Sequence, residues 1–211
     1  MAKIRILVAD DHPIVAEGLR SLLEPTFEVV AIVQNGRELV VAAKKLNPDV
    51  IVADISMPLL NGIDAVSQIR NAGIQAKIIF LTMHTETNYA RRALAEGASG
   101  YVLKHSASSE LLFAIQQALA GRTFVTPTIA ANIKHTRAAK EASLNALENL
   151  TVRQREVLQL LAEGHSASEI SSILNLSRRT IEYHKYHLME ILGLHKSAEL
   201  IQFAIQHGLV L

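Results

Sequence analysis

The first part of the chain contains five short apolar segments, each of which ends abruptly at a polar residue. They lie at residues 3–9, 27–33, 50–53, 78–81 and 99–103. Between and after them, apolar residues recur at three- and four-residue spacing, which predicts amphipathic helices. These helices are expected near residues 13–24, 37–46, 63–69, 89–95 and 109–120. Strands that alternate with helices favour an α/β fold, in which helices cover both faces of a five-stranded parallel sheet.

The last third of the chain has a helical pattern throughout. Capping boxes, a Ser or Thr followed three residues later by Gln or Glu, mark two helix starts at residues 151–154 and 166–169. A short helix, a tight turn at residues 175–177 and a longer helix that ends at Gly193 then follow. This order predicts a helix-turn-helix. A final helix is expected at residues 197–206.

The two patterns predict two domains. An α/β domain is expected at residues 1–124 and a small all-α domain at residues 148–211. Residues 125–147 lack a sustained apolar period and include a stretch rich in Ala and Lys, so we expect a partly helical linker there.

Composition narrows the class of protein. The 211 residues are 49% hydrophobic but only 4% aromatic, so we expect well-packed aliphatic cores. No apolar run approaches the roughly 18 residues of a membrane span, and no signal peptide is apparent. We therefore expect a soluble, cytoplasmic protein with no membrane partner. The absence of Cys excludes disulfides and thiolate metal sites, and a net charge of +1 means that nucleic-acid binding requires local placement of charge.

Four of the predicted strands end in residues that carry chemistry. The strand ends are Asp10 with Asp11, then Asp54, Thr82 and Lys104. Because ligands bind at the carboxyl ends of strands in open α/β sheets, these side chains are expected to share one site. Asp54 read alone also fits a turn residue, since Asp is common in turns. Because four strand ends carry such residues, we favour a shared site over a simple turn role for Asp54.

Residues 1 to about 124 resemble the receiver domain of two-component response regulators. The resemblance rests on the acidic pair, the stretch from Asp54 to Gly62 (Asp-Ile-Ser-Met-Pro-Leu-Leu-Asn-Gly), Thr82, Tyr101 and Lys104, in the order and spacing of that family. It implies a flavodoxin-like domain in which Asp54 accepts a phosphoryl group. The donor would be a sensor histidine kinase or a small phosphodonor.

Three clustered carboxylates repel one another unless a cation lies among them, and an oxygen-rich site suits Mg²⁺. We expect Asp11 and Asp54 to bind the ion directly, Ser56 through its backbone carbonyl, and Asp10 through water. Three carboxylates, Mg²⁺ and Lys104 have formal charges that sum to zero. Phosphorylation of Asp54 would then add about one unmatched negative charge.

That added charge is expected to recruit hydrogen-bond donors from Thr82 and Lys104. A hydrogen bond to a charged acceptor contributes about 1.5–3 kcal/mol, whereas moving a population from 1:99 to 99:1 needs about 5.5 kcal/mol. Lys104 pairing, inward rotation of Tyr101 and dimerisation are therefore expected to supply the remainder. Tyr101 also fits a half-buried aromatic residue of a strand, with no switching role.

Two residues depart from the common receiver pattern. Met83 stands where a small residue is frequent and is expected to crowd the approach to Asp54. His105 follows Lys104 where Pro is usual. Because receivers often have a cis bond at that place, a cis Lys104–His105 peptide is a hypothesis, although it would cost about 3 kcal/mol.

The C-terminal domain resembles the DNA-binding output domain of the LuxR/FixJ class, through residues 150–158, 160–164, 177–184 and 191–194. On the longer helix, Ile181, His184 and Leu188 share an apolar face, so His184 is predicted to be a core histidine. The opposite face would enter a major groove of double-stranded DNA. The resemblance suggests base contacts by Glu182, Tyr183 and Tyr186. It suggests phosphate contacts by Arg178, Arg179, Thr180, Lys185 and His187.

Several readings of the C-terminal residues and of the whole chain stay open. Arg178 and Arg179 also fit a solvated turn. Glu182 stands where many members of the class have Lys, which affects the expected target sequence.

The favoured function is a transcription regulator of the NarL/FixJ type that forms homodimers when Asp54 is phosphorylated. One alternative is an aspartyl-phosphate hydrolase with a helical accessory domain, although position 56 is Ser and offers no second acid. Another is an orphan regulator that is not controlled by phosphorylation.

Overall fold

The computed structural model describes residues 3–135, 147, 149–207 and 209–210. The chain divides into two compact units, Met1–Ala139 and Lys140–Leu211. Each unit is described by itself below.

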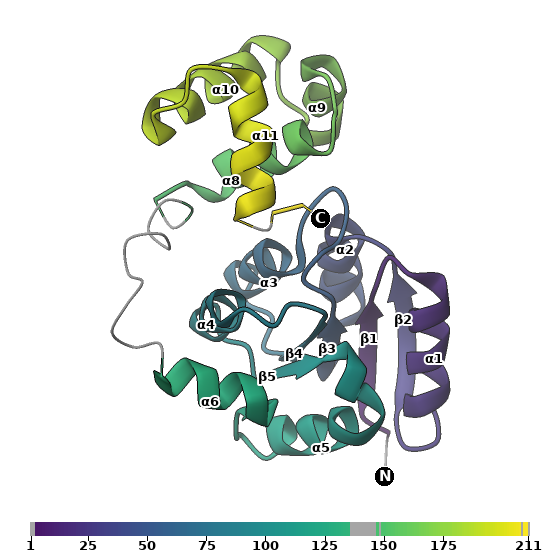
Figure 1. Cartoon of the computed structure of the whole chain (residues 1–211). Helices are drawn as coiled ribbons and strands as arrows, with labels where there is room; N and C mark the ends of the chain where they lie inside the picture. Colours follow the sequence, from purple (N-terminus) through teal and green to yellow (C-terminus); the bar gives the residue numbers. More distant parts are fainter. Residues whose placement is uncertain (1–2, 136–146, 148, 208, 211) are drawn as a thin grey trace. The chain divides into compact units, whose positions relative to one another are not determined.

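The first unit is built on a parallel sheet (Figure 1). The strands are β1 (Arg5–Ala9), β2 (Glu28–Val33), β3 (Val50–Ala53), β4 (Lys77–Thr82), β5 (Gly100–Leu103) and β6 (Phe124–Val125). Their order is β2-β1-β3-β4-β5-β6, and every pair is parallel. The predicted parallel α/β fold is confirmed. The expected number of strands was too low, because the two residues of β6 are too few to give a periodic signal.

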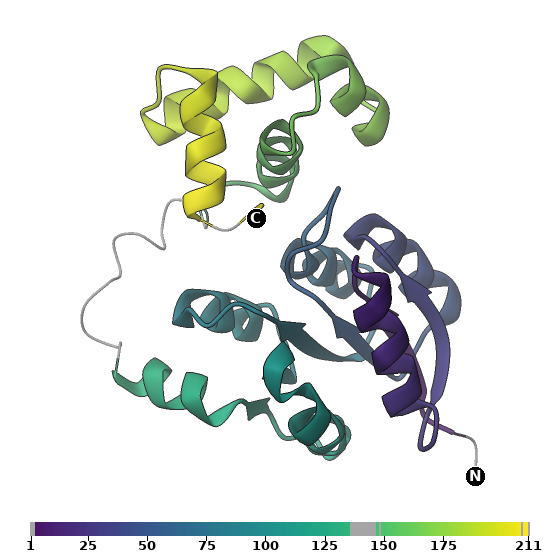
Figure 2. The same ribbon diagram turned by 45° about the vertical axis from the view of Figure 1, so that its right-hand side comes forward.

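Helices cover both faces of this sheet (Figures 1 and 2). They are α1 (Pro13–Leu23), α2 (Gly36–Leu46), α3 (Gly62–Asn71), α4 (Thr87–Ala95), α5 (Ala107–Leu119) and α6 (Pro127–His135). One buried apolar cluster joins α1 and α5 to the sheet, and the other joins α2, α3, α4 and α6 to its opposite face. Within β3, Val50 and Val52 belong to the first cluster and Ile51 and Ala53 to the second, as expected for a strand buried on both faces.

The segment after α5 packs on the first unit. Ile129 of α6 is only 1% exposed and belongs to the core. Arg91 of α4 donates a hydrogen bond from Nη2 to the carbonyl of Ile133, at 3.3 Å. Part of the stretch expected to be a linker is therefore a docked helix. The rest, residues 136–146 and 148, lies outside the described residues, and the domain boundaries stay a prediction.

The hypothesis of a cis Lys104–His105 peptide is wrong, because the described residues contain no cis bond. The chain instead passes from β5 through a short 3₁₀ helix, η1 (Lys104–Ser106), directly into α5. Lys104 reaches its carboxylate partners from this trans backbone. The cost of about 3 kcal/mol for a cis non-proline bond is thus avoided.

The second unit contains α8 (Val152–Ala162), α9 (Ala167–Leu174), α10 (Arg178–Leu192) and α11 (Ser197–Gln206). Both predicted capping boxes are present, at Thr151 and Ser166. The Ser177 side chain caps α10, and Gly193 ends it in the left-handed conformation (φ 65°). The helix-turn-helix is therefore formed by α9 and α10. No helix in the described part of the chain is long and apolar enough to cross a membrane.

Gly62 allows the segment after Asp54 to fold closely back on itself. A Cβ atom at Gly62 would lie 2.0 Å from the Asp54 carbonyl oxygen, whereas a Cβ at Gly18 of α1 would meet nothing within 4 Å. We expect Gly62→Ala to lower the free energy of unfolding of the first unit by about 1–3 kcal/mol. Gly18→Ala, the matched control, should leave it unchanged or raise it by up to about 1 kcal/mol. Urea denaturation of the full chain measures both, and equal effects would contradict the prediction.

Candidate functional site

Three charged groups meet at the carboxyl ends of β1, β3 and β5. The Lys104 ammonium lies 2.8 Å from Oδ2 of Asp10 and 2.7 Å from Oδ2 of Asp54. The Asp10 side chain is 1% exposed and that of Asp54 is 7% exposed. The sheet order explains the meeting, because β3 lies directly beside β1 and its register aligns Ala53 with Ala9. The sequence correctly predicted that these residues share one site.

The Asp54 carboxylate is held from two sides. Its Oδ1 accepts hydrogen bonds from the backbone N–H groups of Ile55 (2.6 Å) and Ser56 (3.4 Å), and its Oδ2 accepts one from Lys104. Burial nevertheless raises the pKa of Asp54, against the opposing effect of Lys104. For Lys104, burial acts to lower the pKa, but the hydrogen bonds to Asp10 and Asp54 outweigh it and the net shift is upward. The ammonium therefore keeps its charge beside two buried carboxyl groups.

The acidic residues and His12 form a group that fits a divalent cation. Ligand atoms of Asp10, Asp11, His12 and Asp54 lie within 4.8 Å of one another. Oδ2 of Asp10 pairs with the Lys104 ammonium at 2.8 Å, and Oδ1 of Asp11 lies 2.9 Å from Nδ1 of His12. Three clustered carboxylates repel one another, and Lys104 supplies only one positive charge to them. The residues present therefore suit a hard cation such as Mg²⁺.

Thr82, Ser56 and Tyr101 are joined by a residue that the sequence reading did not select, His84. The His84 backbone N–H donates to Oγ1 of Thr82 (3.2 Å), and its carbonyl accepts from the Tyr101 hydroxyl (2.9 Å). Its ring shares a hydrogen bond with the Ser56 hydroxyl, Nε2 to Oγ 2.7 Å, and stacks on Tyr89 at 3.9 Å between centroids. Its place two residues after Thr82 was the only signal that could have identified it.

Two of the three residues around His84 are fully buried, and Ser56 is partly buried. Thr82 and Tyr101 are 0% exposed, so Tyr101 is a buried residue and not a half-buried one. Burial raises the pKa of Tyr101, so its hydroxyl keeps its proton and can donate. Burial also lowers the pKa of His84, which favours a neutral ring. The Tyr101 ring already lies inward, which leaves no such rotation for activation to produce from this conformation.

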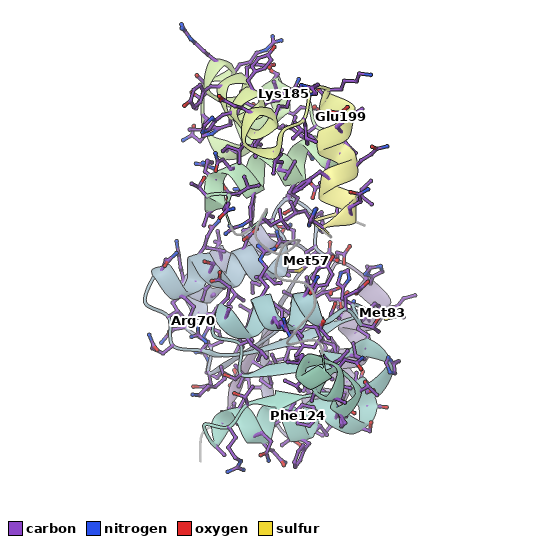
Figure 3. The ribbon with its side chains drawn as sticks, turned by 60° about the vertical axis from the view of Figure 1, so that its left-hand side comes forward. Met57, Arg70, Met83, Phe124, Lys185 and Glu199 are labelled. Atoms are coloured by element: carbon purple, nitrogen blue, oxygen red, sulfur yellow. The ribbon has the colours of Figure 1, made fainter. Side chains whose placement is uncertain are left out.

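Met83 lies at the edge of the first unit (Figure 3). Its side chain is 68% exposed. It lines an apolar hollow together with Leu19 and Leu22 of α1 and with Lys104. Met83 is therefore placed beside the pocket, on the side of α1.

The predicted recognition helix α10 has one buried and one exposed face. Ile181 and Leu188 are fully buried, while Tyr183 and Tyr186 are 63% and 66% exposed. The ring of His187 stacks on that of Tyr183 at 5.8 Å. The other predicted contacts are exposed or partly exposed: Arg178, Arg179, Thr180, Glu182 and Lys185. The Thr180 hydroxyl shares a hydrogen bond with Ser177 at the start of α10.

His184 differs in part from its prediction as a core histidine. Its ring is only partly buried, at the border of the apolar face. Burial lowers its pKa, and Nδ1 is buried without a hydrogen-bond partner.

A parallel α/β unit with a buried Asp–Lys pocket, together with a helix-turn-helix unit, defines a DNA-binding response regulator. The profile of the response regulator receiver domain matches residues 6–116, and that of the bacterial regulatory proteins of the luxR family matches residues 148–204. The chain belongs to the NarL/FixJ family of two-component response regulators. Members are transcription regulators, not catalytic enzymes, so the hydrolase alternative does not hold.

Similar proteins match along nearly the whole chain. The transcriptional regulatory protein MctR of Rhizobium johnstonii is 35% identical over 214 residues, which covers 99% of this chain and 96% of MctR. The RcsB response regulator of Salmonella typhimurium is 28% identical, covers 100% of both chains and has a TM-score of 0.66. An RcsB–DNA complex, 29% identical, covers 95% of this chain and 97% of that one with a TM-score of 0.59.

The raised pKa of Asp54 predicts the effect of removing its charge. A carboxyl with a folded-state pKa above its unfolded value stabilises the fold at low pH. That contribution is lost as pH rises from 3.8 through the folded-state pKa. At pH 7 without divalent cations, Asp54→Asn should therefore be more stable than the wild type in chemical denaturation, because Lys104 keeps Asp10 as its ion-pair partner in this variant. Asp64→Asn, which weakens the buried 2.6 Å ion pair with Arg92, should be less stable. A destabilised Asp54→Asn would contradict the argument.

Proposed function

We propose that Asp54 accepts a phosphoryl group from a sensor histidine kinase or a small phosphodonor, in a Mg²⁺-dependent reaction. The observation that carries the proposal is the Lys104 ammonium between Asp10 and Asp54, with Thr82 at the end of the neighbouring strand. A carboxylate oxygen of Asp54 would form the new bond to phosphorus while the bond from phosphorus to the donor breaks. The donor group leaves with that electron pair. This chemistry would take place in the cytoplasm.

Asp11 and Asp54 would hold the cation directly, Ser56 through its backbone carbonyl and Asp10 through water. The bound ion would offset the negative charge of the three carboxylates and of the incoming phosphoryl oxygens. Lys104 would keep its place at the pocket and pair with a phosphoryl oxygen once Asp54 carries the acyl phosphate, because its ammonium has three donors.

Movement of the Thr82 side chain would be the first conformational change after phosphorylation. Its Oγ1 now accepts a hydrogen bond from the His84 N–H, so a movement of the hydroxyl toward a phosphoryl oxygen would break that bond. Breaking this hydrogen bond would also affect Ser56 and Tyr101, because both of them contact His84. One charged hydrogen bond, about 1.5–3 kcal/mol, is too small for a full population shift of about 5.5 kcal/mol. Lys104 pairing and dimerisation would supply the rest.

The output would be DNA binding by a phosphorylated homodimer. Support comes from exposed apolar residues in the second unit: Ile191, Ile201 and Ile205 are 42%, 37% and 51% exposed. Ile201 and Ile205 lie one turn apart on α11, a spacing that suits packing against a second copy. RcsB is described as dimers bound to DNA. On α10, Glu182, Tyr183 and Tyr186 would meet base edges.

A small phosphodonor tests the phosphorylation step. With Mg²⁺, the wild type should gain one stable phosphoryl group per chain, measured by intact-protein mass, and Asp54→Asn should gain none. Asp49→Asn, an exposed carboxylate that binds the Arg5 N–H at the opposite end of the sheet, should behave like the wild type. Phosphorylation of Asp54→Asn would contradict the proposal. If transcription from a target promoter were equal for the Asp54→Asn variant and the wild type, the orphan regulator would be favoured.

Salt-dependent binding tests the two kinds of DNA contact. Arg178→Ala and Arg179→Ala should each weaken binding on all sequences and reduce the slope of log affinity against log salt by about 1. Glu182→Ala should instead alter preference at one base pair, by about 1–3 kcal/mol. Lys44→Ala, an exposed lysine on α2, is the control and should change neither. If the arginine variants leave the salt slope unchanged, Arg178 and Arg179 do not contact phosphates and belong to a solvated turn.

A further inference from the structure

The ring of Tyr183 has an imidazole ring on two sides, both from its own helix α10. Its centroid lies 5.8 Å from that of His187, with the two planes at 21°, and 5.8 Å from that of His184, with the planes at 64°. These are the offset-stacked and edge-on arrangements that aromatic rings prefer, at centroid separations of about 4.5–7 Å. Because Tyr183 is 63% exposed, these two rings restrict its orientation where the core does not.

His187 is contacted on a second side by a carboxylate. It lies one turn after Tyr183, so the two side chains are neighbours on the exposed face of α10. Its Nδ1 lies 3.4 Å from Oε2 of Glu190, a side chain that is 81% exposed. The His187 ring thus connects the Tyr183 ring to the Glu190 carboxylate along the helix.

This arrangement disfavours a phosphate contact by His187. The resemblance to the LuxR/FixJ class suggests such a contact, but the Glu190 carboxylate repels a phosphate that approaches the same ring nitrogen. The stacked face of the His187 ring is already in use, against Tyr183. The contacts therefore favour a role for His187 in supporting a neighbouring side chain.

A supported aromatic ring affects the recognition of a base edge in two ways. Immobilising a side chain on binding costs free energy, so a ring that is already held in the free protein loses less. The direction of the ring also decides which base pair it meets. In the major groove, an apolar ring surface distinguishes thymine by contact with its methyl group.

We propose that His187 is a positioning residue that holds the Tyr183 ring for contact with the methyl group of one thymine, and so determines the sequence preference at that base pair. The inference rests on the DNA-binding output of the proposed function and deepens it, because it says how one base contact is fixed. His187 acts through Tyr183 and not through a phosphate.

Base-pair preference at fixed salt tests this assignment. The full chain, treated with a small phosphodonor and Mg²⁺, selects sites from a random pool of double-stranded DNA. Affinities are then measured for the selected site and for its single-base-pair variants. Tyr183→Ala should lose about tenfold discrimination at one thymine position. His187→Ala should lose most of the same discrimination at the same position, with an unchanged slope of log affinity against log salt.

Three further proteins separate stacking from other roles of residue 187. His187→Phe keeps an aromatic ring and should retain the discrimination of the wild type. The double variant Tyr183→Ala/His187→Ala should discriminate no worse than Tyr183→Ala, because residues that act as one unit have non-additive effects. His195→Ala, which removes an exposed histidine between α10 and α11, is the control and should match the wild type.

Several results would overturn the inference and leave DNA binding intact. Uniform weakening on all sequences with a smaller salt slope, in both His187→Ala and His187→Phe, would make His187 a phosphate contact. Loss of discrimination in Tyr183→Ala but not in His187→Ala, no recovery in His187→Phe, or additive losses in the double variant would each refute the positioning role. If Tyr183→Ala kept the preference of the wild type, or if the wild type selected no sequence, the base contact of the proposed function would fail together with the inference.

Discussion

The pairing of one buried ammonium with two buried carboxylates governs the organisation of the first unit. Lys104 contacts Asp10 and Asp54 within 2.8 Å, and each of the three residues follows a different strand. A buried charge without a partner costs several kcal/mol, so β1, β3 and β5 must end in register for the pairing to hold. The excess of negative charge that remains after this pairing makes the pocket receptive to a cation. The same chemistry that stabilises the strand ends therefore prepares the site.

His84 and Thr126 connect this pocket to distant parts of the first unit. Through His84, the Thr82 hydroxyl, the Ser56 side chain and the Tyr101 hydroxyl share one residue. The backbone N–H of Thr126 bonds to the Tyr101 carbonyl, and its hydroxyl accepts from the Leu103 N–H and donates to Glu110. Helix α6 begins at the next residue. Tyr101 is thus in contact with the residue that precedes α6.

The sequence predicted the parts of the fold that repeat and the residues that lie at strand ends. Apolar periodicity gave the five longer strands and the helices, and the polar ends of those strands gave Asp10, Asp54 and Lys104. It did not predict β6, because two residues carry no period. It also missed His84, since its role depends on three partners that are distant in sequence or bound through the backbone. The hypothesis of a cis bond after Lys104 came from family resemblance alone, and the local backbone did not follow it.

The loop from Asp54 to Gly62 has a fixed geometry that positions the Asp54 end of the pocket. Leu59 adopts a left-handed conformation (φ 66°), which is strained for a residue with a Cβ, and Gly62 donates to the carbonyl of Ile55 at 2.8 Å. At the start of α3, the Asn61 side chain caps the helix and bonds to Asp64, whose carboxylate pairs with Arg92 of α4. The loop is therefore fixed at both ends, by β3 and by an ion pair to α4. The backbone that carries Asp54 is therefore held in place by the sheet on one side and by a buried ion pair on the other.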